Sequence, residues 1–96
     1  MRITDLPTPA LVADIDAMRF NLGHMAATLP GARCRPHVKA HKSTGLARLQ
    51  AEAGHRSFTC ATPLEMIGMA KAGLGDDLLL ANEVLDPNRL RELAAV

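Results

Sequence analysis

Residues 35–42, with the sequence RPHVKAHK, concentrate side chains that could do chemistry. These eight residues include one arginine, two histidines and two lysines, in a chain whose formal net charge is only +1. If the segment is an extended strand, alternate side chains point to one face. That face would carry Arg33, Arg35, His37 and Lys39. Because a row of cations repels itself unless an anionic ligand or acidic partners lie opposite, we interpret this face as a functional site.

Lys39 would end this strand, and two kinds of chemistry are open to a lysine there. It could bind an anion as a point charge, or it could form an imine with a carbonyl compound. Positive charge nearby, from Arg35, His37 and His41, disfavours the ammonium form and favours the second. Lys42 lies beyond the strand in the loop, so we expect it to have a supporting or solvated role.

The elements that must position Lys39 form four strand–helix units. Strands are predicted at residues 10–15, 32–39, 57–61 and 77–81, where short apolar runs are bounded by turn residues. Apolar residues at helical spacing follow each strand. The expected helix caps are Asp16, Ser43, Thr62 and Asp86. Thr62 and Glu65 form a capping-box pattern, which is the simplest role for that glutamate.

Alternating strands and helices predict an α/β fold with parallel strands and right-handed crossovers. A doubly wound sheet and a (β/α)8 barrel both fit. Gly73-Leu74-Gly75 precedes a strand, which is the wrong order for a dinucleotide turn, and no P-loop string occurs. We therefore predict the first part of a barrel. A complete barrel typically needs about 250 residues, so we expect an incomplete one, with residues 1–15 as the leading segment and first strand and 16–96 as βα units.

Catalytic groups in such folds gather where strands end. Lys39, Thr62 and Asn82 stand at the ends of the second, third and fourth predicted strands, so we expect them around one mouth. His37 and His41 could be read as a metal-binding pair. They straddle a strand end rather than sharing a helix face, however, so we predict no metal site in this chain.

Composition narrows the class of protein. With two Phe, no Trp and no Tyr, the chain lacks the stacking platforms of single-strand nucleic-acid binders, and we expect no nucleic-acid partner. No apolar run approaches the roughly 20 residues of a membrane span. Cys34 and Cys60 form no C-x-x-C motif, and no leader-like segment opens the chain, so we expect a reduced, cytoplasmic protein.

The octapeptide at 35–42 carries a family resemblance, together with TPALV at 8–12 and LANEV at 80–84. The chain resembles the amino-terminal part of the D-threonine aldolase and D-serine dehydratase family. These are fold type III pyridoxal-phosphate enzymes with an alanine racemase-type barrel. The resemblance implies that the rest of the barrel and a carboxyl-terminal β domain are absent from these 96 residues.

The resemblance also implies roles for particular residues. Lys39 matches the lysine that holds pyridoxal phosphate as an internal aldimine and is therefore the expected catalytic residue. His37 and Arg35 match motif positions that could contact cofactor or substrate oxygens, and Thr62 and Asn82 are further candidate cofactor contacts at the mouth. Full-length members use a divalent metal of the Mn or Mg type, whose ligands would lie outside this chain, and the parent would be a homodimer.

The implied activity is that of a lyase acting on β-hydroxy-D-amino acids, first of all D-threonine, which would be cleaved to glycine and acetaldehyde. A D-serine dehydratase-like eliminase and an amino-acid racemase are alternatives within the family. Outside the enzyme class, the chain could be a non-catalytic pyridoxal-phosphate-binding protein or an inert barrel fragment. We expect the 96 residues alone to be inactive.

Overall fold

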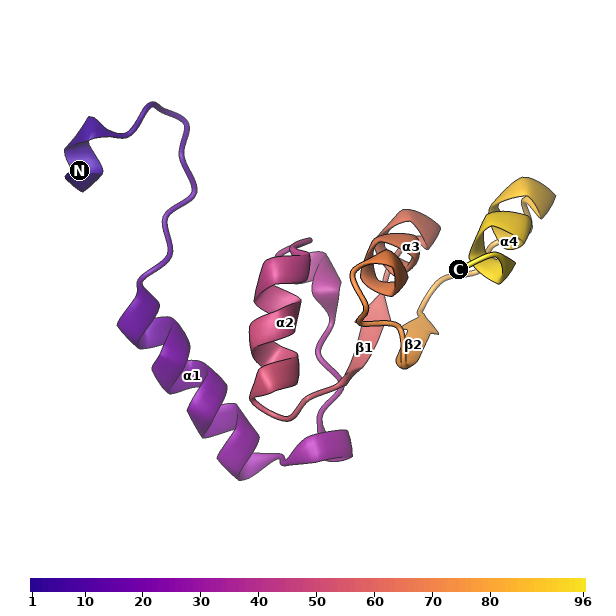
Figure 1. Cartoon of the computed structure of the whole chain (residues 1–96), viewed down its shortest axis with the longest axis horizontal. Coiled ribbons are helices and arrows are strands. Elements are labelled where there is room, and N and C mark those ends of the chain that lie inside the picture. Colours follow the sequence, from indigo (N-terminus) through magenta and orange to yellow (C-terminus); the bar gives the residue numbers. More distant parts are fainter.

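The computed structural model describes all residues, 1–96. It contains four α-helices and two strands, and after the long helix nearest the amino terminus the remaining three helices alternate with the strands (Figure 1). The elements in chain order are α1 (Ile15–Thr28), α2 (Thr44–Glu52), β1 (Ser57–Cys60), α3 (Pro63–Lys71), β2 (Asp77–Leu80) and α4 (Pro87–Ala94). Three short 3₁₀ turns, Ile3–Asp5, Gly31–Arg33 and Val38–Ala40, lie between them. None of the helices is long and apolar enough to cross a membrane.

The strands are parallel, as the alternating pattern predicts. β1 pairs with β2 in the register Ser57↔Asp77 to Cys60↔Leu80, and α3 connects them. A third extended segment lies on the other side of β1, where Thr59 N–H donates to the Pro36 carbonyl at 2.8 Å and His37 forms a parallel bridge with Thr59. The α/β class and the parallel pairing are therefore confirmed.

Three of the four helix starts follow the predicted capping chemistry. The Ser43 hydroxyl accepts from Leu46 N–H at 3.2 Å, and the Thr62 hydroxyl accepts from Glu65 N–H at 3.2 Å. The Asp86 carboxylate accepts from the first backbone N–H groups of α4. Side-chain oxygens satisfy the N–H groups that a helix start leaves without a partner, so these boundaries are encoded locally.

The predicted first strand at 10–15 is wrong. Residues 10–14 form no helix or strand, and Ile15 already belongs to α1. The cap is Asp14 rather than Asp16, since its carboxylate accepts from Asp16 N–H at 3.0 Å and Ala17 N–H at 2.9 Å. An apolar run becomes a strand only when a sheet edge accepts its hydrogen bonds, and here no edge lies beside it.

The predicted strand at 32–39 is also wrong at both ends. Gly31–Arg33 and Val38–Ala40 are 3₁₀ turns, so only the middle of the segment is extended, with a single bridge at His37. Pro36 has no N–H and contributes only its carbonyl to the ladder. Arg33 and Lys39 consequently do not continue one strand face with Arg35 and His37.

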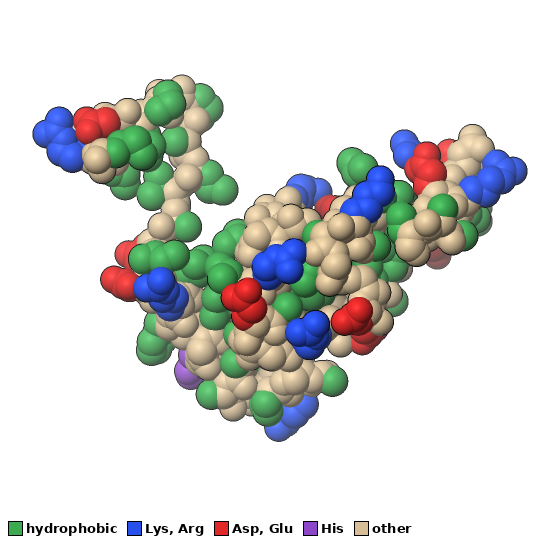
Figure 2. All heavy atoms as spheres, in the orientation of Figure 1, with side chains coloured by type: hydrophobic (Ala, Val, Ile, Leu, Met, Phe, Trp, Pro, Cys, Tyr) green, Lys and Arg blue, Asp and Glu red, His purple; other side chains and the backbone are tan.

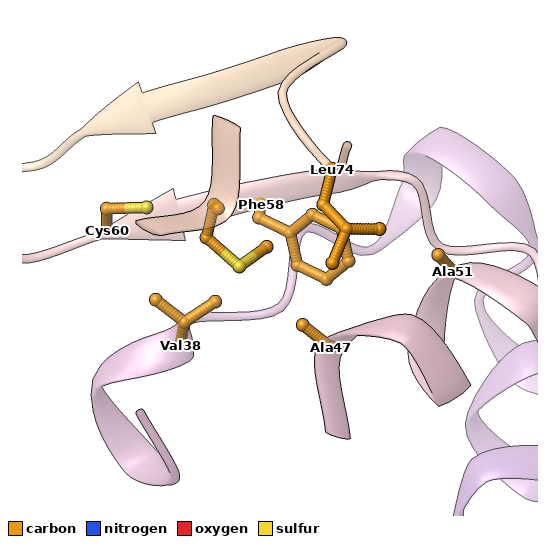
Figure 3. Packing of buried hydrophobic residues seen from close by; sticks show 7 residues of the cluster. Val38, Ala47, Ala51, Phe58, Cys60 and Leu74 are labelled. Carbon is orange, nitrogen blue, oxygen red and sulfur yellow. The ribbon is translucent and has the colours of Figure 1, made fainter. Parts of the chain in front are cut away.

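A small core lies between the sheet and the helices α2 and α3. Phe58 and Cys60 of β1 are fully buried, and Figure 3 shows the Phe58 ring beside Leu74 with Ala47 facing it. The complete cluster comprises Val38, Ala47, Ala51, Phe58, Cys60, Met69 and Leu74. Neither α1 nor α4 contributes a buried residue.

The amino-terminal arm, residues 1–14, projects from this core (Figure 1). Its apolar side chains lie in solvent, with Leu11 99% and Val12 52% exposed, and they form part of the apolar surface in Figure 2. The chain therefore buries little of its own apolar surface outside the β1, α2 and α3 region.

Candidate functional site at the carboxyl ends of the strands

The carboxyl ends of the extended segments meet at one edge of the sheet. His37 is level with Thr59, so Lys39 and Ala61 each stand two residues beyond that bridge. Ala81 N–H donates to the Cys60 carbonyl at 2.9 Å, and the Asn82 side-chain amide donates to the Ala61 carbonyl at 3.1 Å. Lys39, Thr62 and Asn82 therefore follow strand ends at the same edge, in the arrangement predicted from sequence.

Lys39 lies in the 3₁₀ turn Val38–Ala40. Its backbone N–H donates to Nδ1 of His37 at 3.3 Å, which places the ring of His37 at the start of the turn. Its side chain is exposed and forms neither a hydrogen bond nor an ion pair. The amino group of Lys39 is therefore exposed and engaged by no other side chain.

Lys42 differs from Lys39 in both backbone and partners. Its φ of 48° lies in the left-handed region, and its backbone N–H donates to the Val38 carbonyl at 2.7 Å. Its ammonium group is 2.5 Å from Oε1 of Glu65. The supporting role expected for Lys42 thus has a physical basis, because its charged end is engaged by a carboxylate.

Glu65 connects this lysine to the end of β1. Its side chain is only 8% exposed, and Oε2 accepts from Ala61 N–H at 2.7 Å. The predicted capping pair is therefore present with one change. The Glu65 carboxylate accepts from the N–H of Ala61, the residue before Thr62, instead of from the N–H of Thr62 itself. The hydrogen bond from Lys42, aided by the backbone N–H of Ala61, lowers the pKa of Glu65 although partial burial opposes this.

His41 anchors the loop rather than facing a ligand. Its Nδ1 accepts from Ser43 N–H at 3.0 Å, and its Nε2 lies 3.2 Å from Oε1 of Gln50. Because Nδ1 accepts a hydrogen bond, the ring proton belongs on Nε2, which donates to Gln50. Both ring nitrogens therefore fix the loop onto α2.

A cavity of about 240 Å³ opens between the starts of α2 and α3. Polar groups line one part of it, namely Lys42, Ser43, Thr44, Thr62 and Glu65. Sequence reasoning identified Ser43 only as a cap and missed Thr44. The signal that could have found them is that parallel strands bring successive helix starts to the same edge of the sheet.

Two predicted site residues lie elsewhere. The side chain of His37 lines a separate groove of about 560 Å³ between α1 and the extended segment, together with Asp14, Cys34 and His55. Arg35 is at the opposite end of the sheet, where it forms a two-pronged ion pair with Asp77, the first residue of β2, at 2.7 and 2.9 Å. Asp77 is thus the acidic partner of Arg35 alone, and the structure does not bring Arg35 together with Lys39.

The residues at this edge fit pyridoxal phosphate in the chemistry of their donors. A free primary amine reacts with an aldehyde, and hydroxyls at two helix starts suit the oxygens of an anionic group. Lys39 supplies an amine at this edge, while Ser43, Thr44 and Thr62 supply hydroxyls that line the cavity between α2 and α3, a cavity to which Lys42 but not Lys39 contributes. The chain itself contains no group of three or more His, Cys, Asp or Glu residues that could hold a metal ion.

Comparison with known proteins identifies the family and the fold. A family model described as "Alanine racemase, N-terminal domain" matches residues 13–96. A 3-hydroxy-D-aspartate aldolase of Paracoccus denitrificans is 34% identical over 94 residues, which is 95% of this chain and 24% of that protein. A D-threo-3-hydroxyaspartate dehydratase of Delftia sp. is 38% identical over 87 residues, which is 88% of this chain and 22% of that protein.

Among solved structures, the D-threonine aldolase of Filomicrobium marinum superimposes with a TM-score of 0.88 at 36% identity. The match covers 97% of this chain and 26% of that one. The chain thus spans about a quarter of the length of the relatives it matches, and it corresponds to the amino-terminal part of an alanine racemase-type barrel.

Proposed function

Because the chain belongs to the family of alanine racemase N-terminal domains, we propose that it is the cofactor-attaching segment of a pyridoxal-phosphate-dependent lyase. In this proposal Lys39 is the covalent attachment point. The substrates are β-hydroxy-D-amino acids, as the names of the related aldolases suggest, and D-threonine is the first candidate.

One observation carries the assignment of Lys39. The chain has three lysines, and Lys39 is the one that combines a place at the carboxyl edge with an unengaged ammonium group. Lys42 is bound to Glu65, and Lys71 ends α3, at the far end of that helix from Thr62. When bound, pyridoxal phosphate supplies the electron sink for the pair of electrons released at Cα.

The residues of this chain would position the cofactor in different ways. Lys39 would hold it covalently, and the hydroxyls of Ser43, Thr44 and Thr62 could donate to its oxygens or to the substrate. Asn82, which already donates to the Ala61 carbonyl, would keep the ends of β1 and β2 in register. His37 would orient Lys39 through the backbone hydrogen bond to its Nδ1.

A dehydratase is the second candidate function. It is favoured by the relative named D-threo-3-hydroxyaspartate dehydratase, whose identity of 38% is similar to that of the aldolases. The two reactions share a D-configured substrate with a β-hydroxyl group. An aldolase breaks Cα–Cβ and releases glycine and an aldehyde, whereas a dehydratase eliminates the hydroxyl and yields a keto acid and ammonia.

Two features of the parent are proposed on the family resemblance alone. The parent would carry a divalent metal of the Mn or Mg type, with ligands from outside residues 1–96, and would act as a homodimer. Arg35 remains a predicted cofactor contact, and its ion pair with Asp77 gives that role no support.

A chimera tests the proposed function. Residues 1–96 would replace the matched quarter of the Filomicrobium marinum D-threonine aldolase, and acetaldehyde and keto acid release would be measured with D-threonine and D-serine. We expect acetaldehyde from D-threonine. Lys39→Ala should reduce the rate by about 10³-fold or more, as removal of a covalent catalyst does, while Lys71→Ala should leave it unchanged.

Two results would contradict the proposal. Full activity of the Lys39→Ala chimera would show that Lys39 is not the attachment point of the cofactor. Keto acid and ammonia as the main products, from either substrate, would favour the dehydratase over the aldolase.

A further inference from the structure

Two lysines stand three residues apart beside the proposed cofactor site, yet only one of them is engaged. The Lys42 side chain is 65% exposed, so burial does not keep it from reacting. What distinguishes it from Lys39 is its contact with Oε1 of Glu65 at 2.5 Å. An amine that donates to a carboxylate has to leave that contact before its nitrogen can attack an aldehyde.

Glu65 is well placed to hold Lys42. Its carboxylate is nearly buried, and Oε2 is fixed by Ala61 N–H at 2.7 Å, at the end of β1. The glutamate itself belongs to the first turn of α3, where Thr62 Oγ1 accepts from its backbone N–H. Because its backbone N–H and one of its carboxylate oxygens are both hydrogen-bonded, Glu65 has little freedom to move its side chain away from Lys42.

The backbone of Lys42 points to the same conclusion. Its left-handed φ of 48° is unusual for a residue other than glycine, and such conformations persist where surrounding contacts enforce them. The hydrogen bond from Lys42 N–H to Val38 O supplies one of these contacts. The turn thus directs the two side chains differently, with Lys39 unengaged and Lys42 on Glu65.

We infer that Glu65 is a positioning residue that selects Lys39 over Lys42 as the amine that reacts with the cofactor aldehyde. The inference rests on the proposed function, because it concerns the same site. In the step concerned, the neutral Nζ of the lysine attacks the aldehyde carbon of pyridoxal phosphate, a C=N bond forms, and the aldehyde oxygen leaves as water. Glu65 acts on Lys42 alone and touches neither reacting atom.

The test maps the lysine that reacts. The 96-residue chain would be mixed with pyridoxal phosphate, the C=N bond would be reduced to a secondary amine with borohydride, and the adduct at each lysine would be quantified by mass spectrometry. Glu65→Gln keeps an oxygen that can accept from Ala61 N–H but removes the charge. We expect the ratio of Lys42 to Lys39 adduct to rise about fivefold, the effect of losing one partly exposed ion pair.

Matched variants separate selection from general damage. Glu52→Gln removes an exposed carboxylate at the end of α2 that has no ion-pair partner, and it should leave the ratio unchanged. Glu65→Asp keeps the charge and should restore part of the selectivity. An unchanged ratio in Glu65→Gln, with circular dichroism like that of the unsubstituted chain, would overturn the inference while leaving Lys39 as attachment point.

A second measurement needs no substitution. In the folded chain, Lys42 should form less adduct than Lys71, which is exposed and has no carboxylate partner. In concentrated urea the two should react equally. Equal labelling of Lys42 and Lys71 in the folded chain would also overturn the inference. Absence of adduct at Lys39 in the unsubstituted chain would instead contradict the proposed function itself.

Discussion

Lys39 and Lys42 illustrate how far residue-level reasoning reaches. The sequence separates them by their position relative to a strand end, and this separation predicts a supporting or solvated role for Lys42. The carboxylate that engages Lys42 comes from Glu65, 23 residues away, and no local pattern indicates that contact. Arg35 and Asp77 are 42 residues apart, so no local sequence pattern indicates their ion pair either.

The pair of Arg35 and Asp77 makes stability depend on pH. The hydrogen bond from Arg35 is the main cause that lowers the pKa of Asp77 below its usual range, and a further one from Ser57 adds to it. A carboxyl group whose pKa is lower in the folded chain stabilises the fold above its unfolded pKa, about 4, and this contribution is lost as the pH falls through the folded value. We therefore expect the free energy of unfolding to decrease below about pH 4.

Urea unfolding at several pH values measures this dependence. Asp77→Asn should flatten the decrease, because it removes the titrating group. Asp76→Asn is the matched control, since that exposed neighbour is 3.7 Å from Arg56 and makes no comparable two-pronged contact. Equal pH slopes for Asp77→Asn and the unsubstituted chain would show that the ion pair does not contribute.

Among the helices and strands, the helix starts were predicted best, because local sequence signals mark them. Thr62 and Asp86, each followed by proline, mark the starts of α3 and α4 as the structure has them. Strands were harder to predict, because a strand exists only where a neighbour accepts its hydrogen bonds. Residues 10–14 have a strand-like composition but no neighbour, and residues 34–37 have a neighbour on one side and a proline in the middle.

The strand β1 supplies the largest fully buried side chain of the core, that of Phe58. The side chain is fully buried, so Phe58→Ala should lower the free energy of unfolding by about 3–5 kcal/mol through lost burial and a new cavity. Phe20→Ala is the matched control. Phe20 on α1 is 70% exposed and stacks only on His24, so its loss should change stability by less than about 0.5 kcal/mol.

Chemical denaturation followed by far-ultraviolet circular dichroism would compare the two variants. Similar destabilisation by Phe58→Ala and Phe20→Ala would contradict the assignment of the core to β1, α2 and α3. A loss of about 3–5 kcal/mol is a large part of the free energy of unfolding, because that free energy is only about 5–15 kcal/mol for a small domain.

At the scale of the whole molecule, the chain is the amino-terminal part of a barrel rather than a closed one. The β2 strand has no partner on its outer edge, and apolar residues of the amino-terminal arm lie in solvent. Alternation of strands and helices was enough to predict parallel pairing and the class of fold. The size of a complete barrel and the resemblance at 35–42 predicted that the match would cover only part of the relatives.

Attachment of pyridoxal phosphate to Lys39 is tested by mapping the borohydride-reduced adduct on the unsubstituted chain. We expect Lys39 to carry most of the adduct, because its amine is unengaged at the carboxyl edge of the sheet. An adduct on Lys42 or Lys71, with none on Lys39, would contradict the assignment of Lys39 as the attachment point.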